Sequence, residues 1–173
     1  MARKLWLVVG LALAAAGCSQ PRTVQTVLQS AQQTMGNPAS IRYSGTGMSA
    51  FLGQALTAGE AWPRRNLSGF TRTINYEQRS AGDELMFAEP VFGGQQQNTQ
   101  VNGDKAWNVG PNGPVAQLAA AEDRQLHIWL TPHGFLRGAA AASDATLAEG
   151  EGPSVISFTA LGKYKITGTI DAT

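Results

Sequence analysis

The sequence predicts an α+β domain built on a curved antiparallel sheet, and three observations support that fold class. Apolar residues recur at helical spacing near the start of the chain and again between residues 118 and 142. Between residue 40 and about residue 110, and from 155 to 170, apolar and polar residues alternate instead, which is typical of half-buried strands. Charged residues make up only 14% of the chain, while Gly, Gln, Thr and Ser are plentiful. We therefore expect a β-rich exported protein.

The first seventeen residues have the parts of a secretory signal. Arg3 and Lys4 supply a charged start, Leu5–Leu13 is apolar, and Ala14–Gly17 provides the small side chains that a signal peptidase requires. The apolar run is too short to cross a bilayer, which takes roughly 20 residues. Residues 1–17 are therefore predicted to be a cleaved signal peptide.

Cys18, the only cysteine, follows this segment directly. The phrase L-A-A-A-G-C-S resembles the bacterial lipobox, in which the cysteine is acylated and becomes the first mature residue, although Ala15 stands where Leu is commonest. An ordinary signal with Cys18 nearby by chance is the alternative. By resemblance to sorted lipoproteins, Ser19 favours the outer membrane. We expect a periplasmic protein tethered by lipid at Cys18, with residues 18–22 as a linker and 23–173 as one β-rich domain.

Charge and length exclude several classes of protein. Loss of Arg3 and Lys4 with the signal changes the formal charge from +1 to −1. No basic cluster is longer than Arg64-Arg65, so nucleic acid is not an expected partner. Residues 18–173 suffice for one domain with a core and are too few for two.

The elements follow in order from local signals. Val24, Val27 and Leu28 begin a helical pattern over Thr23–Met35, which Gly36-Asn37-Pro38 ends. Alternation then predicts strands around Ile41 and Tyr43, over Phe70–Tyr76, and at Glu84–Ala88, Thr99–Val101 and Lys105–Val109. Asn102-Gly103-Asp104 is a predicted turn, and Gly45-Thr46-Gly47 and Gly110–Gly113 are predicted bulges or turns.

Two stretches interrupt this meander. Gly93–Asn98 is polar and reads as a solvated loop, or alternatively as a lid over a ligand. Leu118–Leu130 reads as a helix with Leu118, Leu126, Trp129 and Leu130 turned inward, and a second helix is expected over Pro132–Ala142.

The chain closes with a predicted hairpin. Val155–Leu161 and Lys163–Ile170 form its strands around Gly162. Ile170–Thr173 stops in mid-alternation, without a turn or a polar tail. We expect the domain to continue in a longer protein.

The residues do not assemble into a catalytic or metal-binding set. His127 and His133 lack the close partners of a zinc site, and no G-x-S-x-G elbow surrounds a serine. The paired carboxylates fall in turns or on exposed helix faces, where solvated charge is the commoner explanation. Catalytic residues, metal ligands and a cofactor are therefore not predicted for this chain.

Aromatic residues are the remaining candidates for a binding site. They could line an apolar pocket between sheet and helices, as a lipid or isoprenoid carrier requires, or they could form the core. Trp62-Pro63-Arg64-Arg65 is the most distinctive surface-like cluster and could meet an anionic partner or a lipid headgroup. The possible ligand or partner surface comprises Trp62, Arg64, Arg65, Trp129 and Phe135.

Several phrases occur together and in order: I-R-Y-S-G-T-G (Ile41–Gly47), L-G-Q (Leu52–Gln54), W-P-R (Trp62–Arg64), T-R-T-I-N-Y-E (Thr71–Glu77), A-W-N (Ala106–Asn108), R-Q-L-H-I-W-L-T-P-H-G-F-L (Arg124–Leu136) and G-K-Y-K-I-T-G-T-I (Gly162–Ile170). As a set they resemble the amino-terminal region of exported bacterial metallo-β-lactamase-fold hydrolases. The resemblance implies an accessory domain before a zinc hydrolase domain. The zinc-binding H-x-H-x-D-H of that later domain is absent here, so zinc is implied only for a missing partner in cis.

The predicted architecture is also similar to the half-barrel of lipoprotein carriers, in which helices lie in the concave face of a curved, incompletely closed sheet. Two functions follow as expectations. The first is a membrane-tethered, non-catalytic domain that supports a hydrolase domain absent from this chain. The second is a periplasmic carrier that binds a lipid or a lipoprotein acyl chain in a cavity between sheet and helices. A free-standing hydrolase is a third possibility that no residue pattern favours.

Overall fold

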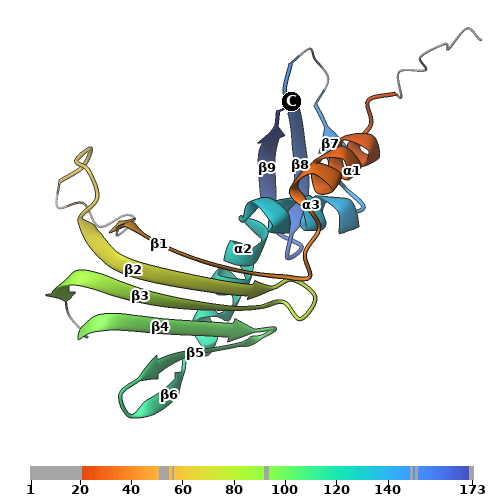
Figure 1. Ribbon diagram of the computed structural model, residues 1–173. Helices are drawn as coiled ribbons and strands as arrows, with labels where there is room; N and C mark the ends of the chain where they lie inside the picture. Colours follow the sequence, from red (N-terminus) through yellow and green to blue (C-terminus); the bar gives the residue numbers. More distant parts are fainter. Residues whose placement is uncertain are drawn as a thin grey trace, which may run out of the picture.

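A computed structural model describes residues 21–50, 55, 57–91, 94–148, 150 and 152–171. The predicted signal peptide and Cys18 lie outside the described residues, as do Phe51, Phe92 and the chain end at Thr173. The described part is an α+β fold with a six-stranded antiparallel sheet and three α-helices, which confirms the predicted fold class at that level (Figure 1).

The larger sheet is a meander in which each strand pairs with the next along the chain. Its strands curve and twist together, and α2 lies against one face near one end (Figure 1). Gly45–Gly47 and Leu67–Gly69 interrupt the register, so the predicted irregularity at Gly45-Thr46-Gly47 is confirmed. The strands are β1 (Ser40–Ala50), β2 (Arg64–Asn75), β3 (Ser80–Val91), β4 (Gly94–Asn102), β5 (Lys105–Gly110) and β6 (Gly113–Ala116).

The predicted polar loop at residues 93–98 is wrong from residue 94 onward. Strand β4 begins at Gly94, and its Gln96 and Gln97 lie opposite Met86 and Leu85 of β3. Pairing with β3 satisfies the backbone of this segment whatever its side chains, so polar composition alone did not make it a loop. Strand β4 is therefore longer than the alternation of apolar and polar residues indicates.

Helix α1 (Val24–Met35) and helix α3 (Pro132–Ala141) confirm their predicted segments to within a residue. Thr23 caps α1, because its hydroxyl accepts from the Thr26 amide and the Thr26 hydroxyl accepts from the Thr23 amide. Thr131 caps α3 through the Gly134 amide, and Pro132 occupies the first turn as expected.

The stretch between them differs from the prediction. It divides into a 3₁₀ helix, η1 (Leu118–Ala120), and helix α2 (Ala121–Trp129). Leu118 and Leu130, predicted to turn inward, are 65% and 54% exposed. They flank α2 rather than belonging to its core-facing stripe, which consists of Ala121, Gln125 and Ile128.

After the helices, three strands form a second antiparallel sheet in the order β7-β8-β9. The predicted hairpin is confirmed as β8 (Ser154–Ala160) and β9 (Tyr164–Ile170), and β7 (Thr146–Leu147) adds a short edge. Leu161 and Gly162 turn the chain with positive φ angles of 53° and 73°. The sequence predicts one sheet; in the described residues these strands pair only with one another.

Two apolar clusters hold the elements together. The first joins α1, α3, β8 and β9 through Leu28, Leu136, Ala139, Ile156, Phe158, Ala160 and Ile166. The second places α2 on the larger sheet through Ile74, Tyr76, Val101, Ala106, Ala121 and Ile128. Trp129 packs against both clusters, so it joins the two parts of the core. Among the described residues, no helix combines the length and the hydropathy of a membrane span.

Candidate ligand groove

The five residues predicted as a ligand or partner surface lie in three places. Trp62 is 47% exposed, and Arg64 and Arg65 begin β2, at the end of the larger sheet away from α3 (Figure 1). The Arg65 guanidinium lies 5.7 Å from the centroid of the Phe87 ring, a cation–π contact. Trp129 and Phe135 belong to the helical part, so the five side chains do not form one surface.

Trp129 is a packing residue at the junction of the two clusters. Its ring also limits the room beside Gly138: a Cβ on that glycine would approach Trp129 to 3.4 Å and the Phe158 ring to 2.7 Å. The glycine therefore lets α3 lie close to β8. Of the two expectations for the aromatic residues, Trp129 therefore meets the one that places them in the core.

Phe135 has two roles. Its ring packs against Phe158, with centroids 5.5 Å apart, and lies where a Cβ on Gly168 would come within 2.6 Å of it. One part of the same side chain also lines a groove between α1, α3 and β9. Phe135 is thus a predicted binding residue that the structure places at a sizeable cavity.

This groove has a volume of about 610 Å³, within the range of small-molecule sites. Three segments contribute its apolar walls: α1 provides Val27, Ala31 and Met35, α3 provides Pro132, Phe135 and Leu136, and β9 provides Ile170. Hydroxyl groups and two charges complete the lining, from Arg22, Thr26, Ser30, Thr34, Ser154, Thr169 and Asp171. Apolar walls from three elements suit an extended apolar ligand.

Arg22 fixes the end of the groove where α1 begins. Its Nη1 donates to the Gly150 carbonyl at 2.9 Å, and its Nη2 donates to the Gly152 carbonyl at 2.6 Å. Its Nε and Nη2 also donate to the Ser154 hydroxyl, at 3.2 and 2.8 Å. These bonds join the segment before α1 to the start of β8, so the groove has a defined entrance.

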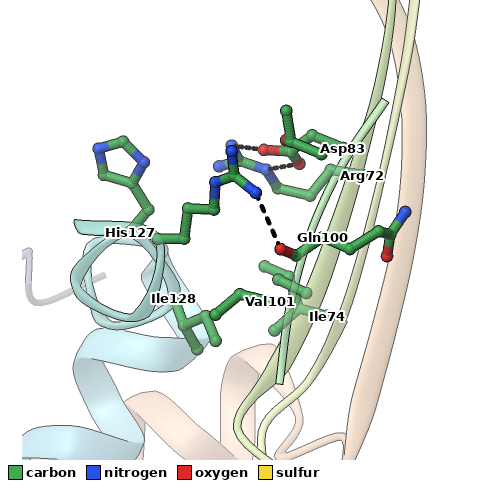
Figure 2. Close-up of a pocket in the computed structure, with 10 residues that line it drawn as sticks. Arg72, Ile74, Asp83, Gln100, Val101, His127 and Ile128 are labelled. Carbon is green, nitrogen blue, oxygen red and sulfur yellow. Dashed lines mark hydrogen bonds and ion pairs between the residues drawn. The ribbon is translucent and has the colours of Figure 1, made fainter. Parts of the chain in front are cut away.

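A second, polar site lies between α2 and the larger sheet (Figure 2). Arg72 of β2 donates from Nε and Nη2 to the two carboxylate oxygens of Asp83 on β3, at 2.5 and 2.6 Å. This bidentate pair raises the pKa of Arg72 further above its usual range. Because both side chains are partly buried, the pair fixes the two inward-facing charges of neighbouring strands.

Arg124 reaches from α2 to the sheet beside that pair. Its Nη1 donates to the carbonyls of Gln100 and Trp107, each at 2.9 Å, and its Nη2 donates to Asn108 Oδ1 at 2.6 Å. Desolvation lowers the pKa of the Arg124 guanidinium. These bonds attach α2 to β4 and β5.

The cavity left at this polar site is small, about 20 Å³, which is room for roughly one water molecule. His127 lines it together with Thr99 and the Arg72–Asp83 pair. The hydrogen bonds of Arg124 make this site a lock between helix and sheet.

The two histidines lie on different helices. His133 Nε2 lies 3.3 Å from the Met35 carbonyl at the end of α1, and His127 lies at the polar site on α2. Within the part of the chain that the structure describes, no three His, Cys, Asp or Glu side chains are grouped closely enough to hold a metal ion. The zinc that the resemblance implies for a downstream domain stays a prediction.

Sequence reasoning missed Arg22, Arg72, Asp83 and Arg124. The sequence does contain a signal for Arg72 and its partner Asp83, because Arg72 occupies an inward position of an alternating strand between Phe70 and Ile74. A charge at such a position requires a buried partner. Arg22 and Arg124 act across long sequence separations, and no local pattern indicates their partners.

Comparisons of the chain with protein-family models, curated proteins and solved structures find no match. The geometry of the two sites is therefore the basis for functional inference.

Proposed function

We propose that this chain is a non-catalytic, membrane-tethered binding domain that holds an apolar chain in the groove between α1, α3 and β9. The observation that carries the proposal is the groove itself: about 610 Å³, with apolar walls from three elements and hydroxyl groups among its lining residues. Burial of an extended hydrocarbon along such walls is favourable at every methylene group.

The contrast between the two sites supports a ligand in the groove. At the polar site, hydrogen bonds from Arg124 draw α2 onto the sheet and leave about 20 Å³. At the groove, α1 packs on α3 through Leu28 and leaves a much larger space beside Val27 and Ala31. The groove thus has the character that a carrier of lipid or of a lipoprotein acyl chain requires.

The tether rests on the sequence. The lipobox-like phrase at Cys18 favours acylation, export and attachment to the outer membrane, and the groove begins at Arg22, close to that cysteine in the chain. A half-barrel resembling the lipoprotein carriers would provide the same kind of binding, and the open antiparallel sheet is compatible with it.

Mass spectrometry and a binding measurement test the proposal together. The Cys18→Ser chain, exported behind an ordinary cleavable signal, is purified and extracted for lipid, and a fluorescent fatty-acid analogue is then titrated into it. We expect co-purifying lipid and saturable binding of the probe. A lipid-free protein that does not bind the probe would contradict the proposal.

A matched pair of variants locates the binding. Ser30 is an exposed wall residue of the groove, whereas Gln29 lies on the opposite face of α1. Ser30→Trp should obstruct the groove and weaken probe binding, and Gln29→Trp should leave it unchanged. Equal effects of the two substitutions would place the probe elsewhere on the protein.

A second candidate function is support of a hydrolase domain in cis, as the resemblance to exported metallo-β-lactamase-fold hydrolases implies. The specific observation in its favour is the position of β9, an edge strand of the described three-stranded sheet, whose end at Ile170 and the following Asp171 line the groove. A domain joined after β9 would adjoin both the groove and that edge.

The reading frame beyond Thr173 tests this second candidate. A downstream H-x-H-x-D-H would support it, and the chain extended through that domain should have a higher melting temperature than the present one. A stop codon directly after Thr173 would remove this candidate without affecting the binding proposal.

A further inference from the structure

We propose that the groove between α1, α3 and β9 takes an acyl chain of the lipid on Cys18 itself, so that the protein partly shields its own anchor. This inference rests on the proposed function and names the ligand of the same groove. It concerns the mature, acylated protein.

The length of chain between the cysteine and the groove permits this. Arg22 lines the groove and is held to β8 and the segment before it by hydrogen bonds to Gly150, Gly152 and Ser154. Cys18 precedes Arg22 by four residues, which span at most about 14 Å when extended. An acyl chain on Cys18 can therefore reach the entrance without any change in the described fold.

The groove then extends along the helix. Its α1 lining runs from Thr26 near the start of the helix to Met35 at its end, and the 12-residue helix is about 18 Å long. An acyl chain that enters at Arg22 would follow Val27, Ala31 and Met35 on one side and Phe135 on the other. The direction of the groove thus leads away from the lipidated terminus.

An acyl chain joined to Cys18 suits a groove whose charges are already placed. The Arg22 guanidinium donates to the carbonyls of Gly150 and Gly152 and to the Ser154 hydroxyl, and Asp171 carries the opposite charge in the same lining. An ester- or amide-linked chain has no ionised end, so it needs no counter-charge from the groove and can bind through its hydrocarbon alone.

Such shielding would regulate attachment to the membrane. A single acyl chain gives only marginal, reversible membrane binding, and stable anchoring takes a second signal. Withdrawal of one chain into the groove therefore weakens the tether, and an occupant that displaces it strengthens the tether. The groove and the anchor become two competing sites for the same hydrocarbon.

The test uses the acylated protein, with the lipid on Cys18 verified by mass spectrometry of the amino-terminal peptide. Its partition onto vesicles of phosphatidylethanolamine and phosphatidylglycerol is measured for three forms: the parent, Ser30→Trp and Gln29→Trp. Because an obstructed groove returns an acyl chain to the bilayer, we expect Ser30→Trp to raise the partition coefficient about tenfold and Gln29→Trp to leave it at the parent value. Circular dichroism melting curves check that both variants fold.

A competition measurement separates this inference from the proposed function. The fluorescent fatty-acid analogue should bind the Cys18→Ser protein and bind the acylated protein at least about tenfold more weakly, a difference of ~1.4 kcal/mol. Equal binding by the two forms would overturn self-shielding while the groove remains a ligand site. Failure of the Cys18→Ser protein to bind would overturn the proposed ligand site. A non-acylated Cys18 in the exported protein would overturn this inference and the proposed tether, while the groove would remain a ligand site.

Discussion

Helices pack against sheets in two regions of this molecule, and they do so by different means. Helix α2 is attached to the larger sheet by apolar contacts around Ile128 and by the hydrogen bonds of Arg124. Helices α1 and α3 pack against β8 and β9 almost entirely through apolar side chains such as Leu28 and Leu136. The first region keeps a cavity of about 20 Å³, whereas the second keeps a groove of about 610 Å³.

This difference shows where the fold can bind a ligand. Directional bonds to carbonyl groups fix the spacing between α2 and β4, so that interface has little room to open. Non-directional apolar packing around α1 allows its outer face to border a groove, because Ala31 and Val27 can contact either protein or hydrocarbon. Binding is therefore expected in the apolar region and rigidity in the polar one.

The strongest perturbation should come from the residue that joins the two regions. Trp129 packs against both apolar clusters, so Trp129→Ala removes contacts in each of them. We expect it to lower the free energy of unfolding by ~3–5 kcal/mol, measured by chemical denaturation. Trp62→Ala is the matched control, since that ring is half exposed, and it should cost no more than about 0.5 kcal/mol. A near-neutral Trp129→Ala would show that the two clusters are independent.

Removal of the polar lock should have the next largest effect. Arg124→Met preserves much of the side-chain volume but leaves two carbonyls and Asn108 without their donor. We expect a loss of about 1–3 kcal/mol, together with faster amide hydrogen exchange in α2 than in α1. Arg42→Met, at an exposed position of β1, should change neither measurement. Equal acceleration of exchange in both helices would contradict a local lock.

The ion pair between β2 and β3 should matter less, because both of its side chains retain partial exposure. Asp83→Asn removes the charge that Arg72 pairs with, and we expect a loss of about 1 kcal/mol from the free energy of unfolding. The additional Arg72→Met substitution should recover part of that loss by removing the unpaired guanidinium. A double variant less stable than Asp83→Asn would argue against this explanation.

The smallest effect is a dependence on pH at the contact between α2 and β9. Glu122 accepts from Lys163, 2.6 Å away, and from the Tyr164 hydroxyl, and these contacts lower the pKa of Glu122 below its ordinary value of 4.5. A carboxyl group with a lowered folded-state pKa stabilises the fold above its unfolded pKa, and that contribution disappears as the pH falls through the folded pKa. The melting temperature should therefore drop slightly with acidification below about pH 4.5.

The Glu122→Gln variant checks this assignment. It should begin with a slightly lower melting temperature at neutral pH and lose less on acidification. The same contact raises the pKa of Lys163 above its ordinary value of 10.5. The stability that Lys163 contributes is therefore lost only when the pH rises above 10.5. A parallel acid response in the parent and Glu122→Gln would assign the pH dependence to other carboxyl groups.

Elements with local signals were predictable from the sequence. The helical spacing that begins at Val24, the first-turn Pro132 and the glycine turn at Gly162 predict their helices and hairpin closely. The strand predicted at Thr99–Val101 is the second part of β4, but the first part was predicted as a loop. Its Gln residues gain their structure from pairing with β3, which no local pattern reveals. Leu118 and Leu130 were predicted to face inward because the apolar spacing does not show that α2 begins at Ala121 and ends at Trp129, which leaves both leucines outside the helix.

The candidate site was less predictable than the fold. Phe135 was identified as a possible binding residue because it is aromatic, but its groove depends on the placement of α1 beside β9. Those segments are separated by more than a hundred residues, so their meeting is a tertiary property. Trp62, Arg64 and Arg65 attracted the same expectation from composition and lie in a different part of the molecule.

Titration of a fluorescent fatty-acid analogue into the Cys18→Ser protein is the sharpest test of a ligand site in the groove, because it measures the groove apart from its anchor. We expect saturable binding that Ser30→Trp weakens at least about tenfold, or ~1.4 kcal/mol, and that Gln29→Trp leaves unchanged. Absence of saturable binding, or an equal response of the two tryptophan variants, would contradict a ligand site between α1, α3 and β9.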